Sequence, residues 1–570
     1  MLTRLLAIVF LLTGIAQADS PYREPLGFSY EWDVGLGRSV YVVGNHPDIG
    51  SWNPVNAVRL RWTPGNVWTG SVAIRAGTEL EYKYIARTNS IDVHCEGGNV
   101  SWLAGPNLTR SVPPQPPAPY EGKTIYYHSS WTNASILYRL ETSTNFVSME
   151  MEQIGPGRSP GEFLYRVSGI ASAGSPIEFV ASGYLDGQQY WDNAAYPGYG
   201  DNNYFTPLDH FFLQDGNIYN YQPPDSVSPP QIVTNQVAST VANIQGRRVR
   251  VLLPRGYEEN TWKHYPVLYL HDGQNVYAPG GAFGSWDADI STIREISQGR
   301  MREVILVAID NTDERLAEYC PPGDTLEGDA GKADRYHQFL LDDVRDYVDS
   351  TFRTLTDSAN TGLMGSSMGG LVSVYAGLEA GQEFGLIGAM SSSFWAATNF
   401  VHRLSTLDTK GGRIYMDAGT GEGSGVWRIW DVYNQMLADG YTQNEDLKVF
   451  IECGAGHNEA AWRGRYLAAA RYLFNLRDEA NLLVYREQQP DMRLVKDPEL
   501  PDWSIRFTSM HGWQYDLEVA TSLTLPDWAE VNGNSIERMP WQEQEFPLIT
   551  DNGPNARYYR IRASLPGTGP

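Results

Sequence analysis

The sequence of 570 residues is 42% hydrophobic, 19% charged and 12% aromatic, and its formal net charge is −24. At roughly 100–200 residues per domain, this length predicts three to five domains. The 17 Trp, 34 Tyr and 18 Phe supply more buriable surface than a disordered chain carries, so general disorder is excluded. Nucleic acids and anionic membranes require clustered Lys and Arg, which the sequence lacks, so neither is expected as a partner.

The beginning of the chain is typical of an export signal. Arg4 precedes the apolar run 5–12, and the small residues Ala16 and Ala18 form a cleavage site, so the signal is expected to span residues 1–18. No later apolar run approaches the roughly 20 residues that span a bilayer. We therefore expect a secreted or periplasmic protein without a membrane-spanning segment.

Three cysteines limit the covalent cross-links. Cys95, Cys320 and Cys453 allow at most one intrachain disulfide, and separate reduced thiols fit the sequence equally well. Their spacing matches no metal-binding pattern. The sequence therefore predicts neither a metal site nor a cofactor.

Two proline-rich stretches, 113–119 and 223–230, divide the chain because proline is excluded from the interior of helices and sheets. In the segments before and between them, short runs such as 39–43 and 79–85 alternate apolar and polar residues, which predicts β-sandwiches. The expected domains are 24–112, 120–222, 231–480 and 490–566, of which the last is a third small β domain with no assigned role.

The third segment has a different pattern. Continuous apolar runs at 266–270 and 304–309 alternate with helical patterns such as 339–352. Strands that are apolar throughout are buried on both faces, as in a parallel sheet covered by helices. The predicted fold class is thus a multidomain chain in which an α/β domain of the α/β-hydrolase type is flanked by all-β sandwiches.

A nucleophile motif lies in this α/β segment. The run 365–370, Gly-Ser-Ser-Met-Gly-Gly, follows a short strand pattern at 361–364 and opens a helix. In a G-x-S-x-G elbow the glycines permit a tight strand-to-helix turn that exposes the central serine. Ser367 is therefore the predicted nucleophile.

A serine nucleophile needs a histidine base that is oriented by a carboxylate. After Ser367, His402 lies in a surface helix pattern and His511 lies in the last β domain, whereas His457 follows the apolar strand 447–451. Loops at the carboxyl ends of strands form the active sites of such sheets, which favours His457.

Two acids compete near strand 413–419. Asp417 lies within the strand, and Glu422, in the loop beyond it, is preferred.

The oxyanion of an acyl-transfer site is normally held by two backbone N–H groups. The residue after the nucleophile, Met368, is expected to supply one. The other is expected from the segment 271–275 that follows strand 267–270, through an amide near Gly273 or Gln274.

The segment 247–475 resembles the esterase D group of α/β-hydrolases, which includes family 1 carbohydrate esterases, enterochelin esterases and mycolyl transferases. The stretches that carry the resemblance are 269–275, 315–321, 365–370, 419–422 and 454–457. The resemblance implies Glu422 as the acid and ester hydrolysis through an acyl-serine intermediate without a metal. It does not choose the acyl group, nor does it separate hydrolysis from acyl transfer.

The β modules suggest what the aromatic residues bind. The runs 42–54, 68–70 and 79–85 resemble family 20 starch-binding modules, and the resemblance implies a glucan site at Trp52, Lys83 and Trp102. The second module is similar to family 25 starch-binding modules, with Trp191 and Trp131 as sugar platforms. Core packing is the alternative role for all of these aromatic side chains.

The sequence therefore predicts a secreted serine esterase that is targeted by its modules to starch or a related α-glucan and acts on an ester-bearing carbohydrate. One alternative is a glycoside hydrolase on α-glucan, although that chemistry needs two facing carboxylates rather than a serine elbow. The other alternative is a starch-binding protein with an inactive hydrolase domain.

Overall fold

The computed structural model describes residues 23–476 and six strands beyond them. Its gaps before residue 477 are short, at 90–94, 96–98, 114–121, 141–142, 173–174, 197–201, 222, 262, 381–382 and 408–409. The expected export signal at residues 1–18 lies outside the described residues. Among the described helices, none has the length and apolar character needed to cross a membrane.

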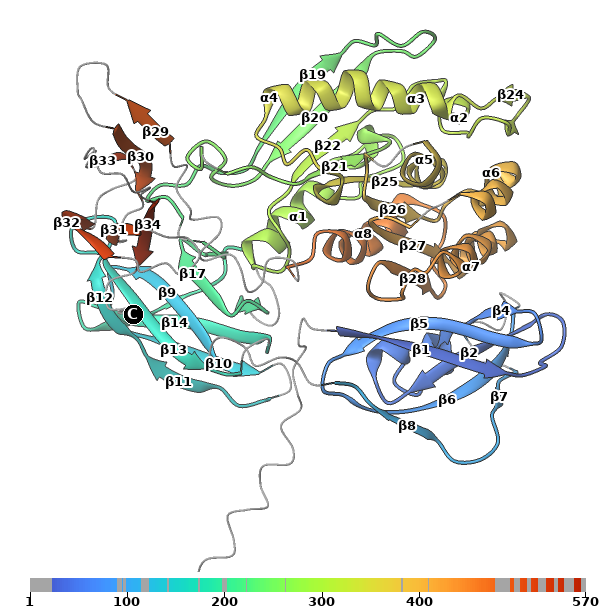
Figure 1. The fold of residues 1–570 in the computed structure, drawn as a ribbon, viewed down its shortest axis with the longest axis horizontal. Coiled ribbons are helices and arrows are strands. Elements are labelled where there is room, and N and C mark those ends of the chain that lie inside the picture. The colour runs from blue at the N-terminus through green and yellow to red at the C-terminus, as the bar shows by residue number, and fades with distance from the viewer. Residues whose placement is uncertain are drawn as a thin grey trace, which may run out of the picture.

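The centre of the molecule is an eight-stranded sheet (Figure 1). The second strand from one edge runs antiparallel to both of its neighbours, and the six strands beyond it are parallel to one another. This arrangement confirms the predicted α/β fold class. Across the sheet the strands are β19 (Gln231–Val237), β20 (Arg247–Leu253), β22 (Ile305–Ile309), β21 (Val267–Leu270), β25 (Thr361–Ser366), β26 (Leu386–Met390), β27 (Arg413–Gly419) and β28 (Leu447–Glu452).

Helices cover both faces of this sheet because its strands are apolar on both sides. On one face, α1 (Ala288–Ser297) and α8 (Glu459–Leu473) pack on Leu268, Leu306 and Met364. The opposite face carries α3 (Ala333–Phe339), α4 (Asp346–Thr351), α5 (Met368–Tyr375), α6 (Thr398–Arg403) and α7 (Ile429–Ala438). The helix predicted at 339–352 begins earlier, at Ala333, and contains a π-helical turn at Leu340–Arg345. Two short elements, α2 (Arg315–Glu318) and the β23–β24 ribbon (Thr325–Leu326, Asp329–Ala330), precede it.

The first module is a sandwich of two antiparallel sheets around a core that includes Val42, Leu60, Trp68 and Ile74. One sheet consists of β1 (Arg23–Glu31), β5 (Val67–Arg75) and β4 (Arg61–Thr63). The other consists of β3 (Val58–Arg59), β2 (Arg38–Gly44), β6 (Glu79–Thr88), β7 (Ser101–Trp102) and β8 (Leu108–Ser111).

The second module is also a sandwich of two sheets, and its core includes Ile125, Phe179 and Phe211. One sheet holds β10 (Thr132–Leu140), β11 (Val147–Glu150), β14 (Ile177–Leu185), β15 (Gln188–Asp192) and β16 (Tyr204–Thr206). The other holds β9 (Lys123–Ser129), β12 (Glu152–Pro156), β13 (Phe163–Ile170), β17 (His210–Gln214) and β18 (Asn217–Tyr219).

The last described strands form two three-stranded sheets. The first is β29 (Arg493–Lys496), β30 (Trp503–Ser509) and β33 (Gln542–Pro547), and the second is β31 (Gln514–Ala520), β32 (Ala529–Glu537) and β34 (Tyr558–Ser564).

The first module lies directly against the β28 side of the central sheet (Figure 1). The backbone of Gln443 pairs with β5: its carbonyl accepts from the Ala73 N–H at 2.8 Å, and its N–H donates to the Ser71 carbonyl at 2.9 Å. From α7, the Tyr433 hydroxyl donates to the Arg59 carbonyl at 3.0 Å. A disulfide between Cys95 and Cys453 adds a covalent link between the two units.

Candidate active site

Ser367 occupies the sharp turn between β25 and α5, as the motif predicts. Its φ of 57° and ψ of −122° lie in a region that non-glycine residues rarely adopt, which is typical of strain held at a functional site. The turn needs glycine beside it, since a Cβ on Gly365 would lie 2.5 Å from the Gly369 backbone. The half-buried Ser367 side chain therefore stands at the carboxyl end of β25 and at the start of a helix.

His457 lies in the loop between β28 and α8, and Glu422 ends a 3-10 turn, Thr420–Glu422, directly after β27. The Nδ1 atom of His457 is 2.9 Å from Oε2 of Glu422. The carboxyl side chain is fully buried, whereas the imidazole is 37% exposed and borders the same cleft as Ser367. With Nδ1 held by the carboxylate, Nε2 is the ring atom left to exchange a proton in the cleft.

The other oxygen of Glu422 is held from inside the protein. Its Oε1 accepts the Gly419 N–H at 2.6 Å and the Ser391 hydroxyl at 2.7 Å. Burial alone raises the pKa of this carboxyl, but the hydrogen bonds from His457, Ser391 and Gly419 outweigh it, and the pKa lies below its usual value. Glu422 is therefore ionised at neutral pH, as an orienting acid must be.

Asp417, the competing acid, lies inside β27 and is fully buried. Its Oδ1 accepts the Ser391 N–H at 3.1 Å and lies 3.4 Å from Nε of Arg465. Burial raises the pKa of Asp417 to about 7, and Arg465 opposes this shift. Among the described contacts of Asp417 there is none with His457, so the structure brings Glu422 to the histidine.

The two predicted oxyanion donors lie at the carboxyl ends of neighbouring parallel strands, β25 and β21. Met368 is the first residue of α5, where backbone N–H groups have no acceptor within the helix. Gln274 lies in a 3-10 turn, Gly273–Asn275, that follows β21. The Gln274 side chain is occupied, because its Oε1 accepts the Asn311 N–H at 3.0 Å, so a backbone amide is the group this turn can offer.

The cleft that contains these groups has a volume of about 1010 Å³ and is open to solvent. Phe283 and Trp286 give one part of its lining an apolar character, and the Phe283 side chain is 78% exposed. Asn311 and Arg315 form a polar part. This arrangement can hold an apolar acyl group beside a polar alcohol, next to a serine and a histidine.

Two serines that the sequence pattern did not single out, Ser391 and Ser393, follow β26 and contact the candidate site. Ser393 Oγ lies 3.2 Å from Ser367 Oγ, and the Ser393 N–H donates to the Ser367 carbonyl at 3.1 Å. Ser391 contacts Glu422 as described above. The signal that would have found them is a run of hydroxyl residues, 391–393, at the carboxyl end of a predicted parallel strand.

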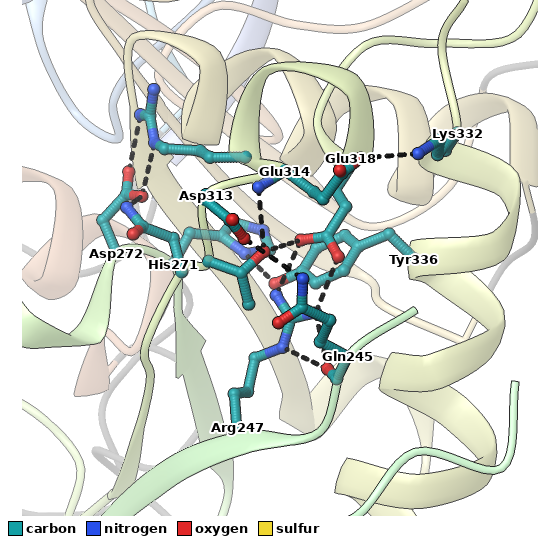
Figure 2. Close-up of polar contacts among 12 residues, drawn as sticks. Gln245, Arg247, His271, Asp272, Asp313, Glu314, Glu318, Lys332 and Tyr336 are labelled. Carbon is teal, nitrogen blue, oxygen red and sulfur yellow. Dashed lines mark hydrogen bonds and ion pairs between the residues drawn. The ribbon is translucent and has the colours of Figure 1, made fainter. Parts of the chain in front are cut away.

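A buried polar network surrounds His271, at the start of the segment 271–275 from which the second oxyanion donor is expected (Figure 2). His271 Nδ1 is 2.9 Å from the Tyr336 hydroxyl, and Arg247 forms two 2.9 Å hydrogen bonds with the carboxylate of Glu318. The neighbouring Asp272 accepts two hydrogen bonds from Arg315, at 2.6 and 2.7 Å. These contacts fix the segment from which the second oxyanion donor is expected.

The buried His271 predicts an acid-sensitive fold. Burial lowers the pKa of His271 to about 3, so the folded protein keeps it neutral while the unfolded chain protonates it near 6.5. The stability that this neutral form contributes is complete above pH 6.5 and is lost as the pH falls toward 3. His271→Asn should flatten the dependence of unfolding free energy on pH by about 1.4 kcal/mol per pH unit in this window. Urea unfolding between pH 4 and 6.5 measures it.

The matched control for this prediction is His402→Asn, which removes an exposed histidine on α6. The control should keep the wild-type slope. An unchanged slope in His271→Asn would show that this histidine does not dominate the acid sensitivity.

The predicted glucan residues of the first module share one face of a sheet. Trp52 packs against a cluster that contains Ile85, and Trp102 lies opposite Ile85 in the β6–β7 ladder. Lys83 is two residues from Ile85 on β6, so its side chain is on the same face. Its Nζ donates to the Gly105 carbonyl at 2.6 Å, and Trp102 is 44% exposed.

In the second module, the structure separates the two proposed platforms. Trp131 stacks with Tyr190 at a centroid distance of 5.8 Å. Trp191 is the next residue on β15, so it points to the opposite face of the strand, where it is 44% exposed. The family 25 resemblance and a sugar-binding role for Trp191 stay predictions.

Of the three cysteines, Cys95 and Cys453 form a disulfide, and Cys320 is a buried free thiol. Cys453 lies four residues before His457, so the disulfide joins the first module to the loop that carries the histidine. Among the described residues, no group of three or more His, Cys, Asp and Glu side chains is placed to hold a metal ion.

Comparison with known proteins adds two family matches. Residues 243–514 match a family described as putative esterase, and residues 25–116 match the starch binding domain. An uncharacterized protein, YbbA of Bacillus subtilis (strain 168), is 26% identical over 250 residues, which are 40% of this chain and 92% of YbbA.

Two further similarities involve an amylase and a solved esterase structure. An α-amylase of Streptomyces violaceus is 38% identical over 78 residues, which are 14% of this chain and only 12% of the amylase. Among solved structures, a ferulic acid esterase from Anaeromyces mucronatus is 22% identical, with 46% of this chain and 94% of that chain covered and a TM-score of 0.33.

Proposed function

Because residues 243–514 match a family described as putative esterase and residues 25–116 match the starch binding domain, we propose that this protein is a serine carboxylic-ester hydrolase that acts on acylated carbohydrate at starch or a related α-glucan. The observation that carries the proposal is the His457–Glu422 hydrogen bond of 2.9 Å beside the same cleft as Ser367. Serine, base and acid thus converge from three separate strand ends.

In the acylation step, Ser367 Oγ forms a bond to the ester carbonyl carbon while its proton passes to Nε2 of His457. The carbonyl electron pair moves onto oxygen, where the Met368 N–H and an amide of the 273–274 turn stabilise the charge. Glu422 stabilises the imidazolium that forms. When the carbonyl re-forms, the bond to the alcohol breaks, and the alcohol leaves with the proton from His457.

In the deacylation step, water attacks the acyl-serine and gives its proton to His457, which returns it to Ser367 as the carboxylic acid leaves. A sugar hydroxyl in place of water would give acyl transfer with the same residues. The half-exposed imidazole and the solvent-open cleft support water as the acceptor.

The contact between the first module and the catalytic unit supports a substrate whose ester group lies close to the bound glucan. Gln443 pairs with β5, and the Cys95–Cys453 disulfide ties the module to the His457 loop. A glucan held at Trp52, Lys83 and Trp102 is then kept near the cleft, which raises the local concentration of its ester groups. Trp191 of the second module is proposed as an additional sugar contact.

We also propose that the protein is secreted or periplasmic. The residues at 1–18 have the pattern of an export signal, and disulfides persist in oxidising compartments.

The proposed function is tested by a substrate panel of p-nitrophenyl acetate, methyl ferulate, acetylated maltodextrin and plain maltodextrin. We expect ester cleavage and no release of reducing sugar from plain maltodextrin. No cleavage of any ester would contradict the proposal. Release of reducing sugar would instead favour a glycoside hydrolase.

Starch binding gives a separate prediction. Trp52→Ala should weaken binding to insoluble starch by roughly ten- to thirtyfold, because an aromatic platform is typically among the few residues that dominate a binding site. A starch pull-down over a range of protein concentrations measures the change. Leu36→Ala, which alters an exposed apolar residue of the same module, is the control and should bind as wild type. Equal binding by both variants would place the glucan site elsewhere.

A further inference from the structure

The loop after β26 contacts two members of the proposed triad, and Ser391 is its most connected residue. Its side chain is buried, and its backbone is left-handed, with a φ of 44°. We propose that Ser391 is a positioning residue, which fixes the carboxylate of Glu422 toward His457 and acts on the reaction only through it. The kinetic consequence of this role rests on the proposed function, whereas the contacts of Ser391 do not depend on it.

The direction of the Ser391 hydroxyl hydrogen follows from its neighbours. The indole N–H of Trp462 lies 2.9 Å from Ser391 Oγ, and Nη2 of Arg465 lies 2.7 Å from it. Indole and guanidinium nitrogens can only donate, so they occupy both acceptor positions of the hydroxyl. The single hydroxyl hydrogen is left for Glu422 Oε1 at 2.7 Å.

This arrangement determines which oxygen of Glu422 serves the histidine. Oε1 already accepts hydrogen bonds from the Ser391 hydroxyl and the Gly419 N–H, and Nη2 of Arg465 lies 3.4 Å from the same oxygen. Oε2 is then directed at His457 Nδ1. A carboxylate fixed at one oxygen has no low-energy rotation that would break the hydrogen bond at the other.

The same contacts give Asp417 a role distinct from catalysis. The Ser391 N–H donates to the Asp417 carbonyl at 2.9 Å and lies 3.1 Å from its Oδ1. Asp417 in turn lies 3.4 Å from Nε of the buried Arg465. The aspartate therefore anchors the backbone of Ser391 and the guanidinium together, two residues that both contact Glu422.

Trp462 connects this cluster to the base. Its indole nitrogen donates to Ser391, and its ring meets the His457 imidazole edge-on, at a centroid distance of 5.0 Å and an interplanar angle of 83°. The tryptophan thus limits the tilt of the ring whose Nδ1 Glu422 must reach.

The test compares Ser391→Ala with Ser392→Ala. Ser392 is the adjacent buried serine, and its Oγ has no hydrogen-bond partner among the described residues. We expect Ser391→Ala to lower kcat roughly 10- to 100-fold on p-nitrophenyl acetate, with KM within about twofold of wild type, because a charge-assisted hydrogen bond is lost. Ser392→Ala should keep kcat within about twofold.

Two further readouts separate positioning from simple destabilisation. Without the Ser391 hydrogen bond, the pKa of Glu422 should rise from its lowered value, which moves the acidic limb of the kcat/KM profile to higher pH. In proton NMR, the downfield resonance of an imidazole N–H bonded to a carboxylate should broaden or shift in Ser391→Ala and stay in Ser392→Ala. Thermal unfolding shows whether both variants are folded.

The NMR readout does not require turnover, so it distinguishes this inference from the proposed function. An unchanged imidazole resonance in folded Ser391→Ala would overturn the positioning role even if esters are cleaved. A wild-type enzyme that cleaves no ester would contradict the proposed function, while a perturbed resonance would still support the role of Ser391. Equal losses of kcat in both serine variants would also overturn the inference.

Discussion

Ser367→Ala is expected to lower kcat for p-nitrophenyl acetate by at least about 10⁴-fold, because removal of the nucleophile leaves only transition-state binding by the remaining cleft. Ser367 lines the cleft and has the strained φ of 57° that is typical of a nucleophile elbow. We expect no neighbouring group to restore the acyl intermediate: the Ser393 hydroxyl, 3.2 Å from Ser367 Oγ, has no described contact with His457.

Initial rates over a range of substrate concentrations measure this loss. Ser373→Ala is the matched control, because Ser373 is a buried serine on the same helix whose hydroxyl donates to the Gly369 carbonyl at 2.8 Å. It should retain kcat within about threefold. Starch pull-down should be equal for both variants. Residual activity above about 1% in Ser367→Ala would show that another residue is the nucleophile.

Glu422→Gln is expected to lower kcat by about 10⁴-fold, since an amide keeps the shape of the carboxylate but cannot stabilise the imidazolium. Glu422 supplies the only described carboxylate contact of His457 Nδ1, at 2.9 Å. The pKa of Glu422 is lowered, so in the wild type this charge is present at neutral pH and is lost only as the medium becomes acidic. Steady-state kinetics at pH 7.5 measure the effect.

Asp417→Asn is the comparison that makes this prediction specific to one acid. An asparagine oxygen can still accept the Ser391 N–H, so kcat should fall by no more than about tenfold. The reverse order, with the larger loss in Asp417→Asn, would assign the triad acid to Asp417 and remove Glu422 from the proposed mechanism.

Much of the fold was predictable from the sequence because the signals are local. Continuous apolar runs marked β21 and β22, since strands buried on both faces carry such runs, and short β-type runs bounded by turn residues marked β2 and β6. The helix predicted at 339–352 shows the limit of such reasoning. Its start at Ala333 and its π-helical turn depend on packing against the sheet rather than on the local sequence.

The candidate site divides in the same way. The sequence by itself predicted Ser367, because the glycines around it favour an elbow through local sterics, and it predicted His457, because parallel strands end at a common edge. It favoured Glu422 over Asp417 as the acid, and the tertiary structure adds the hydrogen bond between Glu422 and His457. Glu422 and Asp417 lie 35 and 40 positions before His457, a difference too small for sequence separation to distinguish them, and a turn of the backbone after β27 brings Glu422 to the imidazole.

The tertiary structure also decided the contacts that span the chain. Cys95 and Cys453 are separated by 358 residues, so no local pattern could pair them. Trp462 and Arg465 of α8 donate to the Ser391 hydroxyl, which in turn donates to Glu422, although nothing in the sequence marks these residues as neighbours. The sequence determines the residue types and favours their local conformations. The orientation of the acid and the attachment of the starch-binding module depend instead on which distant surfaces pack together.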